Sequence, residues 1–467
     1  MEKLYQHLQK SFPFEPTFDQ KTALHELAAF LDPSSTKDVF VLRGYAGTGK
    51  TTLVKAITET LPKIKLKFLL MAPTGRAAKV LSNYSSKKAS TIHRAIYLQK
   101  ASANGGLHFS LKENKRTNTL FIVDEASMIY SEDQFMSDEQ NNVLSDLIEY
   151  VYSSPGNKLM FIGDLAQLPP VGSLLSKAIS PKMLKRDFGL SPSYADMREV
   201  MRQSLDSGIL NNATQLREQL ATKDYLPQFK LGDDFRAIDG SELQDELENY
   251  YGGQSDHDCL FVTRSNKRAN LFNQQIRSRI LYRENELDAG DLLMAVKNNY
   301  FWLEESSEAA FIANGDMLEV QKVNFTDQEM GFRFAEVDAR LIDYPEMPNQ
   351  RIMVNLDCLI SEGPALSQEQ NMQLYQGVLE KYAHLQRGAR IKAITEDPYF
   401  HAVQVKYAYA VTGHKAQGGQ WATVFIDQGY MTEEMLGQEY LRWLYTAVTR
   451  ASERIYLVNF SPKFLIH

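Results

Sequence analysis

The chain contains only two cysteines, Cys259 and Cys358, among 467 residues. They form no CxxC pair and no cluster with histidine, which argues against a disulfide framework or a zinc site and favours a reducing compartment, the cytoplasm. No run of about eighteen apolar residues is present, which excludes a transmembrane helix. The first residues, MEKLYQHLQKSF, lack the apolar core of a secretion signal, so we do not expect secretion.

The chain also lacks an excess of basic residues. Its 51 Lys and Arg are outnumbered by 58 Asp and Glu, and the formal net charge is -7. The total charge therefore counts weakly against nucleic acid as a partner, because binding depends on where the basic side chains lie. What is present is a hydrophobic content of 43%, typical of a globular protein, and a length that predicts two to four domains.

The most specific motif is a glycine-rich loop between an apolar run and a helical pattern. The run VFVL, starting at Val39, is typical of a buried parallel strand, and LVKAITETL repeats apolar residues at helical spacing. Between them, GYAGTGKTT fits the P-loop pattern, in which backbone N–H groups surround phosphates and the lysine, Lys50, reaches the β- and γ-phosphates. The loop residues predicted to bind ATP are Gly44, Ala46, Gly47, Thr48, Gly49, Lys50, Thr51 and Thr52.

Two further apolar runs end in residues that would complete such a site. TLFIVDEASM predicts a strand followed by Asp124, which would hold Mg²⁺ with the Thr51 hydroxyl, and by Glu125, a base that would orient water. KLMFIGDLAQLPPVG ends in Asp164 and Gln167, at the sheet edge where parallel sheets bind ligands. Gln167 would contact the γ-phosphate and sense its loss.

Eight segments resemble, in order, the motifs of superfamily 1 DNA helicases of the 5′-to-3′ branch that includes RecD-like and Dda-like enzymes. They are GYAGTGKTT, APTGRAA, STIHRAI, VDEASM, GDLAQLPPVG, EVMRQ, VTGHKAQG and LYTAVTRA, between Gly44 and Ala451. The resemblance implies an α/β fold: two RecA-like parallel-sheet domains with a β-hairpin insertion and an SH3-like β-barrel insertion. It also implies ATP hydrolysis coupled to 5′-to-3′ movement on single-stranded DNA and to duplex unwinding.

The resemblance assigns further residues to the nucleotide cleft. Gln20 would contact the adenine edge, with a solvent-facing helix residue as the alternative. Arg202 and Arg450 match arginine fingers, which neutralise charge on the γ-phosphate, although each alone could belong to a surface ion pair. Gly418 would bring its backbone to the phosphate. The predicted catalytic residues are Lys50, Glu125, Gln167, Arg202 and Arg450.

A DNA track is expected across both lobes, because phosphate contacts and base stacking suffice for a grip that is independent of base sequence. For each basic residue a solvated surface is the alternative, and His414 could be a packed histidine. Around Asn104 and Gly105 the sequence predicts a β-hairpin. It resembles the family's strand-separating pin, which implies a stacking role for Phe109 or His108, and a plain surface hairpin is the alternative. The predicted DNA-contacting residues are Pro73, Thr74, Arg76, Thr91, His93, Phe109, Thr263, Arg264, Asn266, Thr412, His414 and Lys415.

Changes in periodicity predict the domain boundaries. The first RecA-like domain is expected at 1–185, with the hairpin at about 96–117, and the second at 186–290 plus 399–467. Between them, residues 291–398 contain short alternating segments punctuated by Gly and Asn, which predict a small antiparallel barrel.

The expected cofactors are ATP and Mg²⁺, and the expected partners are single-stranded and forked duplex DNA. A single-strand-binding protein or replication and repair proteins are further candidate partners of what we expect to be a monomer, with no role for a membrane. Two alternatives stay open at this point: a P-loop signalling ATPase with a protein partner, and an RNA helicase. No carboxylate-plus-lysine nuclease pattern stands outside the ATP site, so no nuclease activity is predicted.

Overall fold

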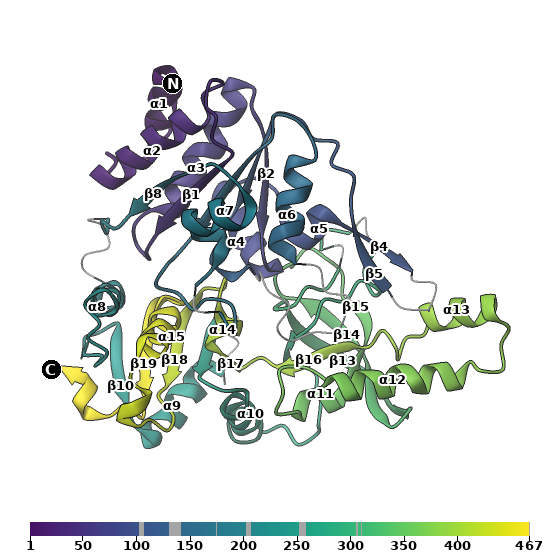
Figure 1. Cartoon of the computed structure of the whole chain (residues 1–467). Coiled ribbons are helices and arrows are strands. Elements are labelled where there is room, and N and C mark those ends of the chain that lie inside the picture. The colour runs from purple at the N-terminus through teal and green to yellow at the C-terminus, as the bar shows by residue number, and fades with distance from the viewer. Residues whose placement is uncertain are drawn as a thin grey trace.

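The computed structural model (Figure 1) describes most of the chain. The described residues are 1–101, 107–129, 142–173, 175–201, 207–251, 258–304, 307–309 and 311–466, with backbone alone at 99–101 and 107–109. Within these ranges, no helix is both long and apolar enough to cross a bilayer.

The first lobe is built on a six-stranded sheet whose strands all run parallel. In sheet order the strands are β3 (Ala89–Thr91), β2 (Lys67–Ala72), β6 (Thr119–Val123), β7 (Lys158–Gly163), β1 (Val39–Gly44) and β8 (Pro192–Met197). Alternate residues of β1 face opposite sides of the sheet. Phe40 and Leu42 belong to one hydrophobic core, and Val39 and Val41 belong to the other. Such a strand is apolar throughout because helices cover both faces of the sheet.

The helices of this lobe begin and end at residues suited to those positions. Thr17 caps α2 in a capping box with Gln20, and Ser180 caps α7, which ends at Gly189 in the left-handed conformation. The helices are α1 (Glu2–Lys10), α2 (Phe18–Phe30), α3 (Lys50–Thr60), α4 (Gly75–Ser85), α5 (Ile92–Ile96), α6 (Val143–Tyr152) and α7 (Pro181–Phe188). The hairpin strands β4 (Tyr97–Ala101) and β5 (Leu107–Leu111) are antiparallel. The expected turn at Asn104 and Gly105 lies outside the described residues.

The second lobe contains a five-stranded parallel sheet. Its strands, in sheet order, are β10 (Phe235–Ile238), β19 (Ala451–Val458), β18 (Trp421–Asp427), β11 (Cys259–Thr263) and β17 (Ala410–Thr412). Its helices are α8 (Gly208–Thr222), α9 (Gly240–Tyr251), α10 (Asn266–Gln275), α14 (Gly413–Ala416) and α15 (Gln438–Val448). A separate pair, β9 (Phe229–Lys230) and β20 (Leu465–Ile466), lies near the C-terminus.

The inserted unit is a closed five-stranded barrel, drawn in green in Figure 1. Its strands are β12 (Leu292–Ala295), β13 (Met317–Glu329), β14 (Phe332–Leu341), β15 (Gln350–Asn355) and β16 (Val403–Tyr407), and α11 (Leu356–Ile360), α12 (Gln368–Lys381) and α13 (Arg387–Thr395) separate the last two. The expectation of a wholly antiparallel barrel is wrong, because β15 and β16 are parallel. The helical connection between them returns the chain so that β16 runs in the same direction as β15.

Both internal boundaries also differ from the prediction. Strand β8 pairs with β1, so the first sheet extends beyond residue 185, and β16 closes the barrel beyond residue 398. The prediction missed both because the apolar pattern of a strand does not identify its partner strand. The α/β class, with two RecA-like sheets, a hairpin and a barrel, is confirmed.

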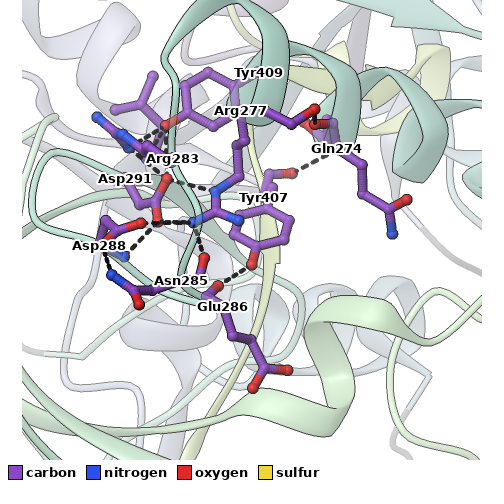
Figure 2. A network of polar contacts seen from close by, with 12 residues as sticks. Gln274, Arg277, Arg283, Asn285, Glu286, Asp288, Asp291, Tyr407 and Tyr409 are labelled. Atoms are coloured by element: carbon purple, nitrogen blue, oxygen red, sulfur yellow. Dashed lines mark hydrogen bonds and ion pairs between the residues drawn. The ribbon is translucent and has the colours of Figure 1, made fainter.

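A buried polar network joins the barrel to the second lobe (Figure 2). Asp291, immediately before β12, is fully buried, and its two oxygens accept hydrogen bonds from Arg277 Nε and Nη2, both at 2.8 Å. Arg283 and the Tyr409 hydroxyl contact the same carboxylate. A buried carboxylate is tolerated only with such partners, so these contacts fix where the chain leaves the second lobe for the barrel.

We predict that Asp291→Ala will lower the free energy of unfolding by about 3–5 kcal/mol, because it leaves two guanidinium groups without their shared anion. Chemical denaturation followed by circular dichroism measures the change. The matched control is Asp338→Ala, which removes the half-buried partner of the exposed Arg351 in the same barrel and should change stability little. Equal effects of the two changes would contradict a structural role for the network.

Candidate nucleotide cleft and nucleic-acid interface

The P-loop lies at the carboxyl edge of the first sheet, between β1 and α3. Lys50 Nζ donates hydrogen bonds to the Gly44 oxygen at 2.7 Å and the Tyr45 oxygen at 2.9 Å. It also lies 4.0 Å from a carboxylate oxygen of Asp164, which follows β7. The tips of β1 and β7 thus converge at one place, as their order in the sheet requires.

Gln20 packs against this loop. Its Nε2 donates to the Thr48 oxygen at 3.0 Å, its Oε1 accepts from the Thr17 N–H at 2.9 Å, and the residue is 2% exposed. The solvent-facing alternative is therefore wrong, whereas contact with adenine stays a prediction. A Cβ atom on Gly49, whose φ is 87°, would lie 2.5 Å from Gln20 Nε2, so this close approach requires glycine.

Asp124 and Glu125 follow β6 and face the same cleft. Asp124 accepts a hydrogen bond from the Glu125 N–H at 2.8 Å and another from the Tyr84 hydroxyl. Glu125 has a φ of 49°, a conformation that is costly for a non-glycine residue and often found at functional sites. Sequence analysis missed Tyr84, since a single tyrosine within an amphipathic helix gives no functional signal.

Charged residues of both lobes act on the Glu125 carboxyl group. Burial and the neighbouring Asp124 raise the pKa of Glu125 to about 7, while Arg450 and Lys50 act to lower it. Arg450 follows α15 in the second lobe, and Lys50 begins α3 in the first. Lys50 and Arg450 therefore act on the same carboxyl group from the two lobes.

Arg450 is 6% exposed and forms no ion pair with any residue that the structure describes, so the surface alternative is wrong. Its guanidinium donates to the Gly419 oxygen at 3.0 Å, to the Thr446 oxygen at 3.1 Å and to the Thr449 hydroxyl at 3.1 Å. Arg202 lies outside the described residues. Its neighbour Met201 donates its N–H to the Gly47 oxygen at 3.0 Å, so the EVMRQ segment reaches the P-loop at this point.

Several other contacts cross from the second lobe to the first. The Tyr445 hydroxyl accepts from the Ala46 N–H at 2.8 Å and donates to Asp164 at 2.8 Å. The Leu168 N–H donates to the Thr446 hydroxyl at 2.9 Å. Gln167, beside it, is 6% exposed, and its Oε1 has no partner in the described part of the chain. Sequence analysis assigned no role to Tyr445, although it lies within the LYTAVTRA segment.

Gly418 packs against the first lobe, and its approach to a phosphate stays a prediction. A Cβ atom on this residue would lie 3.0 Å from Ala77 Cβ and 3.3 Å from the Thr74 hydroxyl, at the start of α4. Gly418 therefore approaches the APTGRAA segment with its Cα side. Its φ of 74° and this tight contact between lobes account for the glycine.

The predicted DNA residues of the first lobe are partly enclosed. Pro73 precedes Thr74, which caps α4 by accepting from the Ala77 N–H at 3.2 Å. The Arg76 guanidinium lies 3.9 Å from the Trp421 ring centre and donates to the Gln420 oxygen at 3.3 Å.

In the STIHRAI segment, Thr91 caps α5 and is 7% exposed. Burial lowers the pKa of His93 to about 4, so this histidine is neutral near pH 7 and offers no charge to a phosphate.

The predicted residues of the second lobe differ in exposure. Thr263 is fully buried and its hydroxyl donates to the Ser265 oxygen at 3.1 Å, so the prediction that this side chain contacts DNA is wrong. Arg264 is exposed, with its guanidinium 5.2 Å from the Tyr440 ring centre. Burial lowers the pKa of His414, which favours its packed, neutral form.

Asn266, Thr412 and Lys415 line one small pocket. The side chain of Phe109 lies outside the described residues, so its stacking role stays a prediction.

A loop of the barrel covers part of the expected track. Lys415 Nζ donates to Asn314 Oδ1 at 2.5 Å, and burial lowers the pKa of Lys415 to about 8. Arg94, in the STIHRAI segment, donates to the Glu308 oxygen at 2.9 Å. A Cβ atom on Gly75 would lie 2.2 Å from an Asp316 oxygen. The predicted contact segments of both lobes therefore meet the barrel as well as each other.

Two family models match the chain: an AAA domain at 27–173 and a UvrD-like helicase C-terminal domain at 407–458. The chain is similar to an uncharacterized protein of Acanthamoeba polyphaga mimivirus, at 23% identity over 93% of this chain and 98% of that protein. It is 30% identical to the ATP-dependent DNA helicase dda of Enterobacteria phage T4, over 54% of this chain and 55% of that one. With the ATP-dependent RecD2 DNA helicase of Deinococcus radiodurans it shares 34% identity, over 33% and 19% of the two chains.

The matched segments are similar to those of superfamily 1B helicases. The matched segments span about half the length of the phage relative and about a fifth of RecD2. The residues matched by the two family models contain the P-loop, VDEASM and GDLAQLPPVG segments at one end and the LYTAVTRA segment at the other. Helicases of this superfamily use ATP with Mg²⁺.

The residues around the P-loop fit a magnesium nucleotide. Thr51 is exposed at the start of α3, and Asp124 supplies a carboxylate at the neighbouring strand tip. Mg²⁺ prefers hard oxygen ligands of this kind and is usually bound by one or two protein groups plus phosphates and water. Within the described ranges no cluster of three His, Cys, Asp or Glu offers an alternative metal site.

We predict that Tyr84→Phe will raise the Mg²⁺ concentration for half-maximal ATP hydrolysis about tenfold, because the hydroxyl that orients Asp124 is lost. Titration of Mg²⁺ at saturating ATP measures the effect, and nucleotide binding in EDTA should be unchanged. The control is Tyr152→Phe, which loses a hydroxyl bonded to the Asp38 oxygen at the opposite edge of the sheet. A normal Mg²⁺ requirement in Tyr84→Phe would refute the assigned role.

Proposed function

We propose that this chain is an ATP-driven motor that moves 5′ to 3′ on single-stranded DNA and unwinds duplex ahead of it. The observation that carries the proposal is the contact of the two lobes at the P-loop, where the Tyr445 hydroxyl of the second lobe bonds the Ala46 N–H and Asp164 of the first. A cleft at such a contact is completed only when both lobes close on a nucleotide, so binding and hydrolysis drive their relative movement.

In this proposal the residues around the P-loop divide the work of hydrolysis. Thr51 and Asp124 would hold Mg²⁺, which neutralises charge on the phosphates. Lys50 would exchange its two carbonyl partners for phosphate oxygens. Glu125 would orient the attacking water and accept its proton, and Arg450 would stabilise the charge that develops on the γ-phosphate.

Gln167 suits a sensing role in the same site. Its amide oxygen is buried and lacks a partner among the described residues. An amide can accept a hydrogen bond from water through its oxygen and donate one to a phosphate through its nitrogen. Gln20, bound to the P-loop, is proposed to lie against the adenine.

DNA is the proposed polymer because the relatives with assigned activities are named DNA helicases. Forked duplex DNA is the proposed substrate. The second lobe is proposed to contact it through Arg264, Asn266, Thr412 and Lys415. A monomeric state, a cytoplasmic location and an interaction with a single-strand-binding protein or with replication and repair proteins belong to the same proposal.

We predict that Glu125→Gln will bind ATP normally but hydrolyse it at least about 100-fold more slowly, because an amide cannot accept the proton of water. Steady-state hydrolysis and equilibrium binding of a fluorescent nucleotide measure the two effects. Lys50→Ala should abolish turnover. A Lys50→Ala enzyme with normal kcat would overturn the assignment of the P-loop, and loss of binding in Glu125→Gln would make that residue structural.

We predict that the chain will unwind a forked duplex with a 5′ single-stranded tail and leave one with only a 3′ tail intact. A gel assay of strand separation, with Glu125→Gln as the inactive control, measures the polarity. Hydrolysis stimulated by RNA but not DNA oligonucleotides would replace the proposal with an RNA helicase. Hydrolysis insensitive to both would favour a signalling ATPase.

A further inference from the structure

The hydroxyl of Tyr445 lies inside the P-loop although the residue belongs to the second lobe. Tyr445 is part of α15 and is 1% exposed. Its hydroxyl accepts a hydrogen bond from the Ala46 N–H and donates one to Asp164 Oδ2, each at 2.8 Å. One hydroxyl thus connects the P-loop, the tip of β7 and a helix of the opposite lobe.

These two bonds set the hydroxyl in competition with a nucleotide. The Ala46 N–H points at Tyr445, so this amide is engaged before any phosphate oxygen reaches it. A phosphate oxygen can accept that hydrogen bond in place of the hydroxyl. It cannot take over the contact with Asp164, because phosphate and carboxylate are both anions and repel each other at short range. Filling the loop therefore requires the hydroxyl to move or to change partner.

Lys50, like Tyr445, is hydrogen-bonded to backbone groups of the P-loop and lies close to Asp164. Its ammonium group is bonded to the Gly44 and Tyr45 oxygens and lies 4.0 Å from Asp164. When Lys50 turns to a phosphate, Asp164 loses a nearby positive charge. The hydrogen bonds from the Tyr445 hydroxyl and from the Ala166 N–H, each at 2.8 Å, then compensate it, since a buried carboxylate needs partners.

Helix α15 connects this hydroxyl to Arg450. The Arg450 N–H donates to the Ala447 oxygen at 3.1 Å, and the Arg450 side chain donates to the Thr446 oxygen at 3.1 Å. Thr446, adjacent to Tyr445, also accepts from the Leu168 N–H of the first lobe. A shift of Tyr445 is therefore a shift of the turn that holds Arg450.

We propose that Tyr445 is a positioning residue that couples occupancy of the P-loop to the placement of Arg450. With the loop empty, its hydroxyl holds the two lobes together through Ala46 and Asp164. When phosphates take the Ala46 amide, the hydroxyl is released from the loop, and α15 carries Arg450 to its working position. The inference rests on the proposed function, because it assigns the coupling within that same site.

The test is Tyr445→Phe in the full chain, which keeps the ring and removes only the hydroxyl. Nucleotide affinity, measured with a fluorescent ADP analogue, should increase about three- to tenfold, because a competitor for the loop amide is gone. The kcat of DNA-stimulated hydrolysis should fall about tenfold, because α15 no longer follows the state of the loop. Opposite changes in affinity and kcat are not expected from a simple loss of stability.

The matched control is Tyr251→Phe, which removes a second-lobe hydroxyl bonded to the Tyr409 oxygen at 3.1 Å. It should leave both constants unchanged. In a double-mutant cycle with Asp164→Asn, the effects on affinity should be non-additive if Tyr445 acts through Asp164. Unchanged or weakened nucleotide affinity in Tyr445→Phe, or additive effects in the cycle, would overturn the inference.

These outcomes are separable from failure of the proposed function. If the wild-type chain neither binds nucleotide nor hydrolyses it, the proposed function fails and the coupling fails with it. If the wild-type chain unwinds DNA while Tyr445→Phe has normal constants, only the coupling is refuted.

Discussion

The arrangement of the molecule depends on an interface where the carboxyl edge of one parallel sheet meets residues from the other lobe. A triphosphate carries more negative charge than one glycine loop can neutralise, so donors from two bodies are needed. Arg450 and Lys50 act on the same carboxyl group, and Tyr445 enters the loop itself. The Tyr445 and Thr446 hydroxyls are both hydrogen-bonded across this interface.

The barrel is an extension of the second lobe rather than a separate body. Leu293 of β12 and Phe261 of β11 belong to one hydrophobic cluster, and the Asp291 network closes the junction. The same barrel contacts the first lobe through Glu308 and the expected strand-binding Lys415 through Asn314. Any movement between the lobes must therefore move the barrel across the first lobe, where the APTGRAA and STIHRAI segments lie.

The sequence was sufficient to predict features that depend only on a short segment of the chain. The P-loop, the acidic tip of β6 and the order of the helicase segments could be found because each depends on neighbours a few residues away. Sequence reasoning failed at Thr263, where the residue type suggested a ligand contact but the packing encloses the side chain. A glycine needed for contact between helices and one needed beside phosphate look alike in a sequence.

By itself the sequence determined the local elements and the nucleotide-binding loop, because backbone preferences and hydrophobic spacing act over short windows. Only the tertiary structure decided which side chains meet at the cleft. Ala46 and Tyr445 are 399 residues apart, and Asp164 and Tyr445 are 281 apart. Such pairs form only when two sheets, their helices and the inserted barrel have packed, and no local pattern in the chain encodes the distance between them.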